Sequence, residues 1–136
     1  MSPRLALSIS AVQSLLFGAL LLLFPASILA VSGLALPDAG VAISRGAGAT
    51  LVGLGVIDWM LRGATGDTAR AFLGGNLAVQ VMSLAVNGGE VIAGHLPVQA
   101  GSASVLHALL SAMLLVALRT ALPPGPTSEP APPAIT

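Results

Sequence analysis

"RGAGATLVGLGVIDWMLR", residues Arg45 to Arg62, decides the fold class of this 136-residue chain. The stretch is apolar and rich in glycine, lies between two arginines, and carries one aspartate and the only tryptophan. It is not a phosphate-binding loop, because a Walker motif ends in Lys-Ser or Lys-Thr and the chain contains no lysine. It also lacks the third glycine and the preceding strand of a dinucleotide-binding fingerprint. A membrane helix is therefore the favoured interpretation.

The composition of the whole chain supports a membrane protein. Hydrophobic residues make up 55% of the sequence and charged residues only 7%, with a mean hydropathy of +0.96. Soluble domains contain about 25% charged residues, so the surplus apolar surface must face lipid. The absence of cysteine excludes disulfides and thiolate metal sites. A net charge of zero provides no basic surface for nucleic acid.

Three further apolar segments have a similar length, which predicts an all-α membrane four-helix bundle. Twenty helical residues rise about 30 Å, the thickness of the hydrocarbon core. For the first segment we favour an uncleaved span over a signal peptide, because the apolar run is longer than the usual apolar core of a signal peptide. The spans expected within one domain, residues 1–122, are 5–24, 44–61, 71–92 and 103–122.

Two segments outside these spans have a different composition. Residues 25–43 are apolar but broken by prolines and glycines, which favours a short helix on the membrane surface. Residues 123–136 contain six prolines, which predicts a disordered or polyproline-like tail.

The arginines predict the orientation in the membrane. With a cytoplasmic N-terminus, only Arg45 lies outside, and the inner side carries Arg4, Arg62, Arg70 and Arg119. The positive-inside rule then places both termini in the cytoplasm, in a multi-pass protein of a bacterial inner membrane. The residues expected at the cytoplasmic interface are Asp58, Trp59, Arg62 and Arg70.

Four glycines of the second span fall on two parallel stripes of the helix. Gly46 and Gly53 lie on one stripe, and Gly48 and Gly55 lie on the other. Small residues let a neighbouring helix backbone approach closely, which drives helix association in lipid. We therefore expect this helix to be packed from two sides.

The third span carries polar residues at helical spacing along a single face. They are Asn76, Gln80, Ser83, Asn87 and Glu90. Such a stripe must point into the bundle or toward another subunit. The other spans offer polar partners: Ser10, Gln13 and Ser14 on the first, Asp58 on the second, and Ser104, His107 and Ser111 on the fourth.

Depth along the spans divides these residues into two groups. The outer boundary holds one pair of opposite charges, so we expect Arg45 and Glu90 to pair or to share a polar network. In the inner half, Asp58 is expected to pair with Arg62 one turn later, or with Arg70. The candidate polar cluster inside the membrane consists of Arg45, Gln80, Asn87, Glu90 and His107.

This cluster has two interpretations. It is a small pocket for a lipid head group, a quinone or a proton, or it consists of interhelical hydrogen bonds worth about 1 kcal/mol or less each; we favour the second. His95 and His107 do not match a haem site, because neither of the first two spans carries a facing histidine. We expect no cofactor, no metal site and no catalytic residues.

The motif Arg45-x-x-Gly48 followed by "LVGLGVIDWMLR", with "LLLFP" ending the first span, resembles the DoxX-like group of small bacterial four-helix membrane proteins. The resemblance implies a four-helix bundle and transfers no catalytic residues. Small multidrug resistance transporters also have four spans. They differ because their first helix carries an essential glutamate and aromatic residues, whereas this chain has no acid there and 3% aromatic residues.

These features favour a non-enzymatic accessory subunit that binds a larger bacterial membrane complex, or itself, through its small-residue faces. The alternative is a small transporter or a lipid- or quinone-binding protein that uses the polar face of the third span. A cavity lined by Gln80, Asn87, Glu90 and His107 would support the alternative. An enzyme is the least favoured reading, since Glu90 with His107 is the one candidate acid–base pair.

Overall fold

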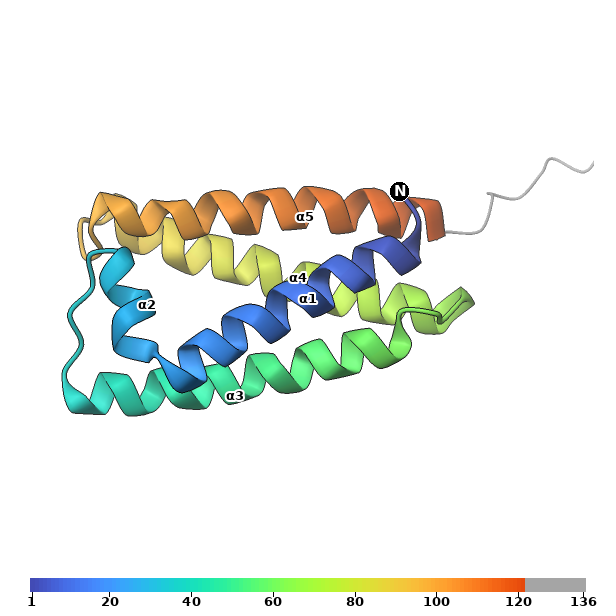
Figure 1. Ribbon diagram of the computed structural model, residues 1–136. Coiled ribbons are helices and arrows are strands. Elements are labelled where there is room, and N and C mark those ends of the chain that lie inside the picture. Colours follow the sequence, from blue (N-terminus) through green and yellow to red (C-terminus); the bar gives the residue numbers. More distant parts are fainter. Residues whose placement is uncertain (122–136) are drawn as a thin grey trace, which may run out of the picture.

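The computed structural model describes residues 1–121, which form an all-α bundle of four long helices (Figure 1). Each of the four is long and apolar enough to cross a membrane. The predicted fold class is confirmed; the tail expected at residues 123–136 lies outside the described residues. The elements are α1 (Pro3–Leu23), α2 (Pro25–Val31), α3 (Asp38–Leu61), α4 (Gly66–Ile92), the 3₁₀ turn η1 (Val98–Ala100) and α5 (Gly101–Ala121).

Two helices extend beyond the apolar segments of the sequence. Helix α3 begins at Asp38 rather than at residue 44, and α4 begins at Gly66 rather than at residue 71. In both, an acidic residue occupies the first turn, where it interacts favourably with the positive end of the helix dipole. In α4 this residue, Asp67, also pairs with Arg70 one turn later. Hydropathy alone does not detect such polar first turns.

Two glycines end helices at the same end of the bundle. Gly33 after α2 and Gly94 after α4 both have a φ of 76°, a conformation that L-residues with a side chain rarely adopt. After α2, the Leu34 N–H donates to the carbonyl of Leu29, the hydrogen bond that defines a Schellman motif. This turn brings Leu29 and Leu34 to the same side of the chain, where both line the cavity described below.

The four long helices form two antiparallel pairs, α1 with α3 and α4 with α5 (Figure 1). Contacts between the pairs are much sparser than within them: α3 and α4 touch at few points, and α3 and α5 at fewer still. Helix α2 lies across one end of the bundle, and the N-terminus lies at the other end beside the end of α5. There the Thr120 hydroxyl donates to the Met1 carbonyl across 2.9 Å.

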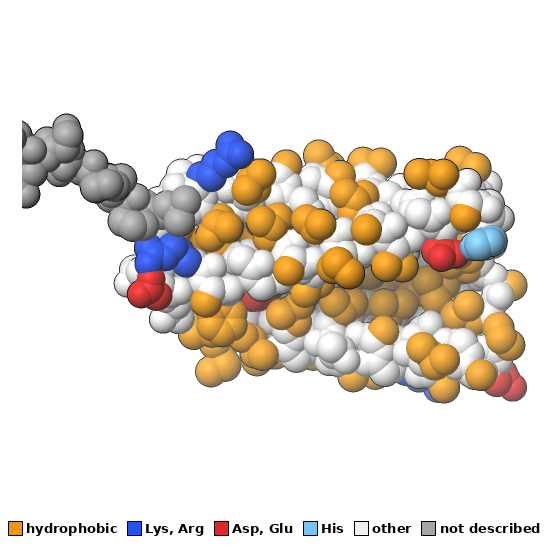
Figure 2. Space-filling view, turned by 180° about the vertical axis from the view of Figure 1, so that it is seen from behind, with side chains coloured by type: hydrophobic (Ala, Val, Ile, Leu, Met, Phe, Trp, Pro, Cys, Tyr) orange, Lys and Arg blue, Asp and Glu red, His pale blue; other side chains and the backbone are white. Residues whose placement is uncertain are grey.

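The two pairs are joined by an apolar core near the N-terminal end of α1. The fully buried members of this core come from α1, α4 and α5: Ala6, Leu7, Leu73, Leu114 and Ala117. The face shown in Figure 2 carries hydrophobic side chains along most of its length, and Met60 on α3 is 75% exposed. Lipid is the solvent that fits such a surface, which makes this a multi-pass membrane protein.

Candidate functional site: an intramembrane cavity between two helix pairs

The contact between α1 and α3 is the closest helix contact in the described chain. A Cβ added to Gly48 would lie 2.6 Å from the Leu22 backbone nitrogen, and one added to Gly18 would lie 2.8 Å from the Gly48 carbonyl oxygen. A Cβ added to Gly55 would lie 2.8 Å from the Leu15 backbone nitrogen. Because these neighbours are backbone atoms, the two helices approach so closely only where glycine is present.

The other two predicted packing glycines lie on an open face of α3. A Cβ added to Gly46 or to Gly53 would meet nothing within 4 Å. The described chain therefore packs α3 from one side, through the stripe of Gly48 and Gly55. The stripe of Gly46 and Gly53 faces away from the bundle.

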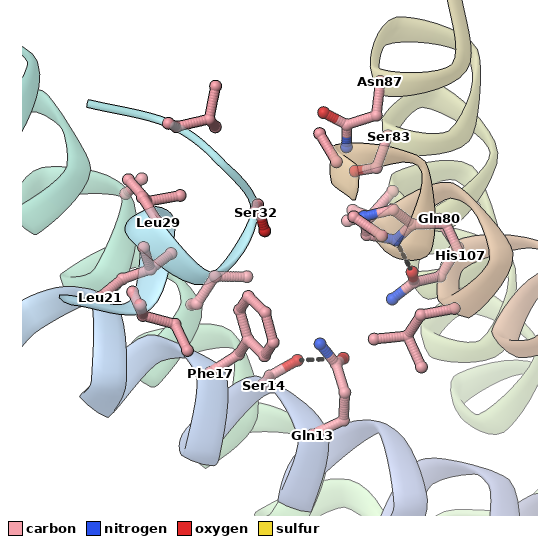
Figure 3. A pocket seen from close by; sticks show the side chains of 18 of the residues that line it. Gln13, Ser14, Phe17, Leu21, Leu29, Ser32, Gln80, Ser83, Asn87 and His107 are labelled. Carbon is pink, nitrogen blue, oxygen red and sulfur yellow. Dashed lines mark hydrogen bonds between the residues drawn. The ribbon is translucent and has the colours of Figure 1, made fainter. Parts of the chain in front are cut away.

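A cavity of about 400 Å³ occupies the space between the two helix pairs, at the small end of the range of ligand pockets. Its walls come from all four long helices, and α2 with the segment after it covers one end (Figure 3). Phe17 and Leu21 of α1 and Leu29 of α2 lie on one side. Ser83 and Asn87 of α4 face them across the cavity.

The polar wall of the cavity is built on α4 and α5. Nδ1 of His107 lies 2.6 Å from Oε1 of Gln80. A carbonyl oxygen only accepts, so Nδ1 is the donor and the Gln80 amide NH₂ remains free. Gln80 is only 3% exposed, and its side chain points from α4 toward the opposite wall (Figure 3).

The opposite wall contributes a second amide. Oε1 of Gln13 accepts from the Ser14 hydroxyl across 3.5 Å, which leaves the Gln13 NH₂ available. None of the residues that line the cavity is an aspartate, glutamate or arginine. The site therefore presents uncharged amide and hydroxyl groups within a mainly apolar lining.

The cavity communicates with the side of the bundle. Figure 2 shows a hollow between α4 and α3, with apolar side chains along its floor. This is the pair of neighbouring helices with the fewest mutual contacts. Leu51 and Leu54 of α3 line the cavity opposite Val79 of α4. Because both helices are long enough to span a membrane, the opening faces the acyl chains of the bilayer.

The predicted polar cluster is divided by the structure. Gln80, Asn87 and His107 line the cavity, whereas Arg45 and Glu90 are exposed and do not. The expected pair of Arg45 and Glu90 is not formed within residues 1–121. Oε2 of Glu90 instead lies 2.9 Å from Nδ1 of His95, because the turn after α4 folds His95 back over the last helical turn.

At the predicted cytoplasmic interface, Asp58 pairs with neither Arg62 nor Arg70, the partners expected from the sequence. The Arg62 guanidinium donates to the Trp59 carbonyl and stacks over its indole, 4.0 Å from the ring centre. Arg70 pairs with Asp67. Asp58 is fully buried and bonds to Asn76 of α4, so neither arginine pairs with it.

Several residues of the site were not identified from the sequence. Gly18 completes the α1–α3 contact, and the spacing of Ala11, Ser14 and Gly18 on one face of α1 is the signal that would have indicated it. Leu29 and Ser32 line the cavity although their segment was expected to lie on the membrane surface. No periodicity in the sequence indicates that this segment folds over the cavity.

Fold and cavity together define a class: a multi-pass helical membrane protein with an uncharged internal site. Comparisons of the chain with protein-family models, with curated proteins and with solved structures find no match.

Proposed function

We propose that the protein binds a neutral, lipid-soluble molecule that carries carbonyl or hydroxyl oxygens. One observation carries this proposal: the cavity between the helix pairs combines an apolar lining with free amide donors, and none of its lining residues within 1–121 is an acid or an arginine. Such a site satisfies the oxygen atoms of a ligand without having to neutralise it. Membrane quinones belong to this ligand class. The cavity therefore supports a lipid- or quinone-binding protein, the alternative predicted from the polar face of the third span, better than an accessory subunit.

The lack of arginine among the described residues of the lining argues against a phospholipid head group as ligand. Phosphate is recognised by arginine or lysine, which supply charge-assisted hydrogen bonds. Arg45, the arginine at this half of the bundle, is exposed and does not line the cavity. Gln80 and Gln13 offer neutral donors from opposite walls, a suitable arrangement for a ring with oxygens at both ends.

The lateral hollow between α3 and α4 supports entry from the bilayer. A cavity of about 400 Å³ holds a ring-sized head group but not a long isoprenoid chain. We propose that the head group lies between Gln13 and Gln80 and that the tail passes outward between Leu54 and Val79.

Titration with a short-tailed benzoquinone tests this function. The protein in lipid nanodiscs is expected to bind it saturably, and Ala103→Phe, which fills the cavity wall, should abolish binding. Ala108→Phe is the matched control, because Ala108 is exposed on the same helix and does not line the cavity. Equal binding by both variants, or partition that does not saturate, would contradict the proposal.

A role as accessory subunit of a larger membrane complex is the second candidate, and the open stripe of Gly46 and Gly53 favours it. Small residues exposed to lipid allow a helix of another protein, or of a second copy, to approach α3 closely. Purification in a mild detergent should recover a partner in fixed ratio. Gly46→Leu should release this partner, and a monodisperse wild-type monomer would contradict the role.

We further propose a bacterial inner membrane, cytoplasmic termini and kinship with the DoxX-like group. Four arginines support the orientation, since the helix bounds put them at the end of the bundle where α1 begins: Arg4, Arg62, Arg70 and Arg119. Reporter fusions to the α3–α4 loop test it. A periplasmic signal from that loop would reverse the proposed topology.

A further inference from the structure

A second polar site lies one helical turn from the cavity wall. The carboxylate of Asp58 on α3 is fully buried, and Asn76 of α4 is 2% exposed. Nδ2 of Asn76 donates to Oδ1 of Asp58 across 2.7 Å and to the Phe72 carbonyl across 3.0 Å. The Asn76 NH₂ therefore has both of its donors engaged.

The remaining oxygens of the same two residues have no partner. Oδ2 of Asp58 and Oδ1 of Asn76 are both buried and accept no hydrogen bond within the described chain. Each is an acceptor that lacks a donor, and buried polar atoms are almost always satisfied.

The helix registers place two serines at the same level. Gly55 packs against Ala11 and Leu15, so α1 and α3 run antiparallel in a register that brings Ser10 opposite Asp58. Gln80 bonds to His107 on α5, so one turn further along both helices Asn76 lies opposite Ser111. The hydroxyls of both serines are also buried without a partner.

Within residues 1–121, no arginine pairs with Asp58. On α3, the Arg62 side chain is directed to the carbonyl and ring of Trp59. On α4, Arg70 is engaged with Asp67 and with the carbonyl of Ala121. The polar groups that the helix registers place at this level are uncharged: Ser10 on α1, Asn76 on α4 and Ser111 on α5. His107 lies one turn nearer the cavity on α5, at the level of Gln80.

We propose that Asp58 and Asn76 form a reversible proton-binding site inside the bundle. A proton adds to the Asp58 carboxylate at Oδ2, and the resulting O–H donates to Oδ1 of Asn76. The acid and the amide are then joined by two hydrogen bonds in one ring. An ionised carboxylate without a cation is costly at this depth, whereas the neutral acid removes the charge and supplies the missing donor.

The packing around the pair determines the route of the proton. Beyond Asp58 toward the N-terminal end, the core of Leu7, Leu73 and Leu114 is fully buried and apolar. Toward the other end, Asn76 is followed one turn later by Gln80, which lines the cavity. The polar side of the pair is therefore the side of the cavity, and the proton enters and leaves from there. The site itself does not depend on the cavity holding the proposed ligand.

Infrared spectroscopy of the protein in lipid vesicles tests the proton site. At neutral pH we expect a carboxylic-acid C=O band from a side chain sheltered from water. This band should be absent in Asp58→Asn and shifted in Asn76→Leu. Glu90→Gln is the matched control, since Glu90 is exposed, and should leave the band unchanged. A wild-type spectrum with carboxylate bands alone at neutral pH would overturn the proposal.

Labelling with a hydrophobic carbodiimide, which reacts with protonated carboxyl groups in apolar surroundings, provides a test on the unmodified chain. Peptide mass mapping should identify Asp58 as the main modified acid, with labelling lost at strongly alkaline pH. Labelling confined to the exposed acids would contradict the site. A melting temperature that rises with sodium concentration but not with acidification would indicate that the Asp58–Asn76 site binds Na⁺. That result would overturn the proposal of a proton site.

Discussion

Helix α1 meets its neighbours through two faces that pack in opposite ways. Toward α3, Gly18 meets Gly48 with backbone atoms in contact. Toward α4 and α5, the same helix presents Gln13 and Phe17 to a cavity of about 400 Å³. The two faces belong to one helix with one lipid environment, so the difference arises from the side chains alone.

The comparison shows how a short membrane chain combines rigidity with an internal site. Where glycines oppose one another, dispersion contacts hold the helices together without any polar group. Where Gln13 and Phe17 of α1 face Gln80 and Asn87 of α4, the helices stay apart and the polar groups remain available. The tight α1–α3 pair then serves as a fixed wall for the cavity.

The largest effect is expected from a bulky residue in the tight contact. Gly48→Leu should prevent α1 and α3 from packing, because its side chain would overlap backbone atoms of Leu22 and Gly18. We expect loss of the monodisperse, cooperatively melting species in size-exclusion chromatography and circular dichroism. Gly46→Leu on the open stripe should fold normally. If Gly48→Leu and Gly46→Leu fold equally well, the α1–α3 contact is not the tight face that the structure indicates.

A methyl group in the same contact should have an intermediate effect. Gly55→Ala places Cβ 2.8 Å from the Leu15 nitrogen, and such overpacking typically costs about 1–3 kcal/mol. Gly53→Ala meets nothing within 4 Å and should be neutral or stabilising by up to about 1 kcal/mol. Denaturant titration in micelles measures both. A destabilised Gly53→Ala variant would indicate an unseen neighbour on the open face.

On the loose side, ligand affinity should change more than stability. Gln80→Leu removes one interhelical hydrogen bond, which in membrane proteins contributes about 0.6 kcal/mol. The same change removes a donor to the proposed ligand, and losing about 1.4 kcal/mol weakens binding tenfold. Thermal melting and quinone titration of the same variant separate the two effects. Unchanged affinity would exclude Gln80 from the binding site.

The smallest effect is expected from the exposed charges. Arg45→Ala and Glu90→Gln should each change the free energy of unfolding by less than about 1 kcal/mol, since exposed ion pairs contribute little. A double-mutant cycle on the two positions should give no coupling. A coupling energy of 1 kcal/mol or more would restore the pair predicted from the sequence.

The fold class was predictable, because four apolar segments of membrane length allow few other arrangements. The sequence also allows a prediction of which glycine stripe of α3 faces the bundle. Asp58 lies one turn after Gly55 on the same stripe, and a buried acid requires that stripe to face inward. The other stripe continues to Val56 and Met60, which lie exposed to lipid.

The partners of the charged residues were not predictable from spacing. The helical spacing of Arg62 and Asp58 allows them to pair, but the Arg62 side chain stacks on Trp59 instead. Asp58 accepts a hydrogen bond from Asn76 on a different helix. The cavity could not be predicted either. It depends on how far apart the two helix pairs lie and on the fold of residues 32–37 after α2, and neither leaves a periodic pattern in the sequence.

Native mass spectrometry of the protein released directly from its own membranes tests the central claim, that the space between the helix pairs is a binding site. The wild-type chain is expected to retain one neutral lipid-soluble molecule. Ala103→Phe should be released without it, and Ala108→Phe should retain it. Wild-type protein released with an empty cavity, or the same bound molecule in all three forms, would contradict the claim.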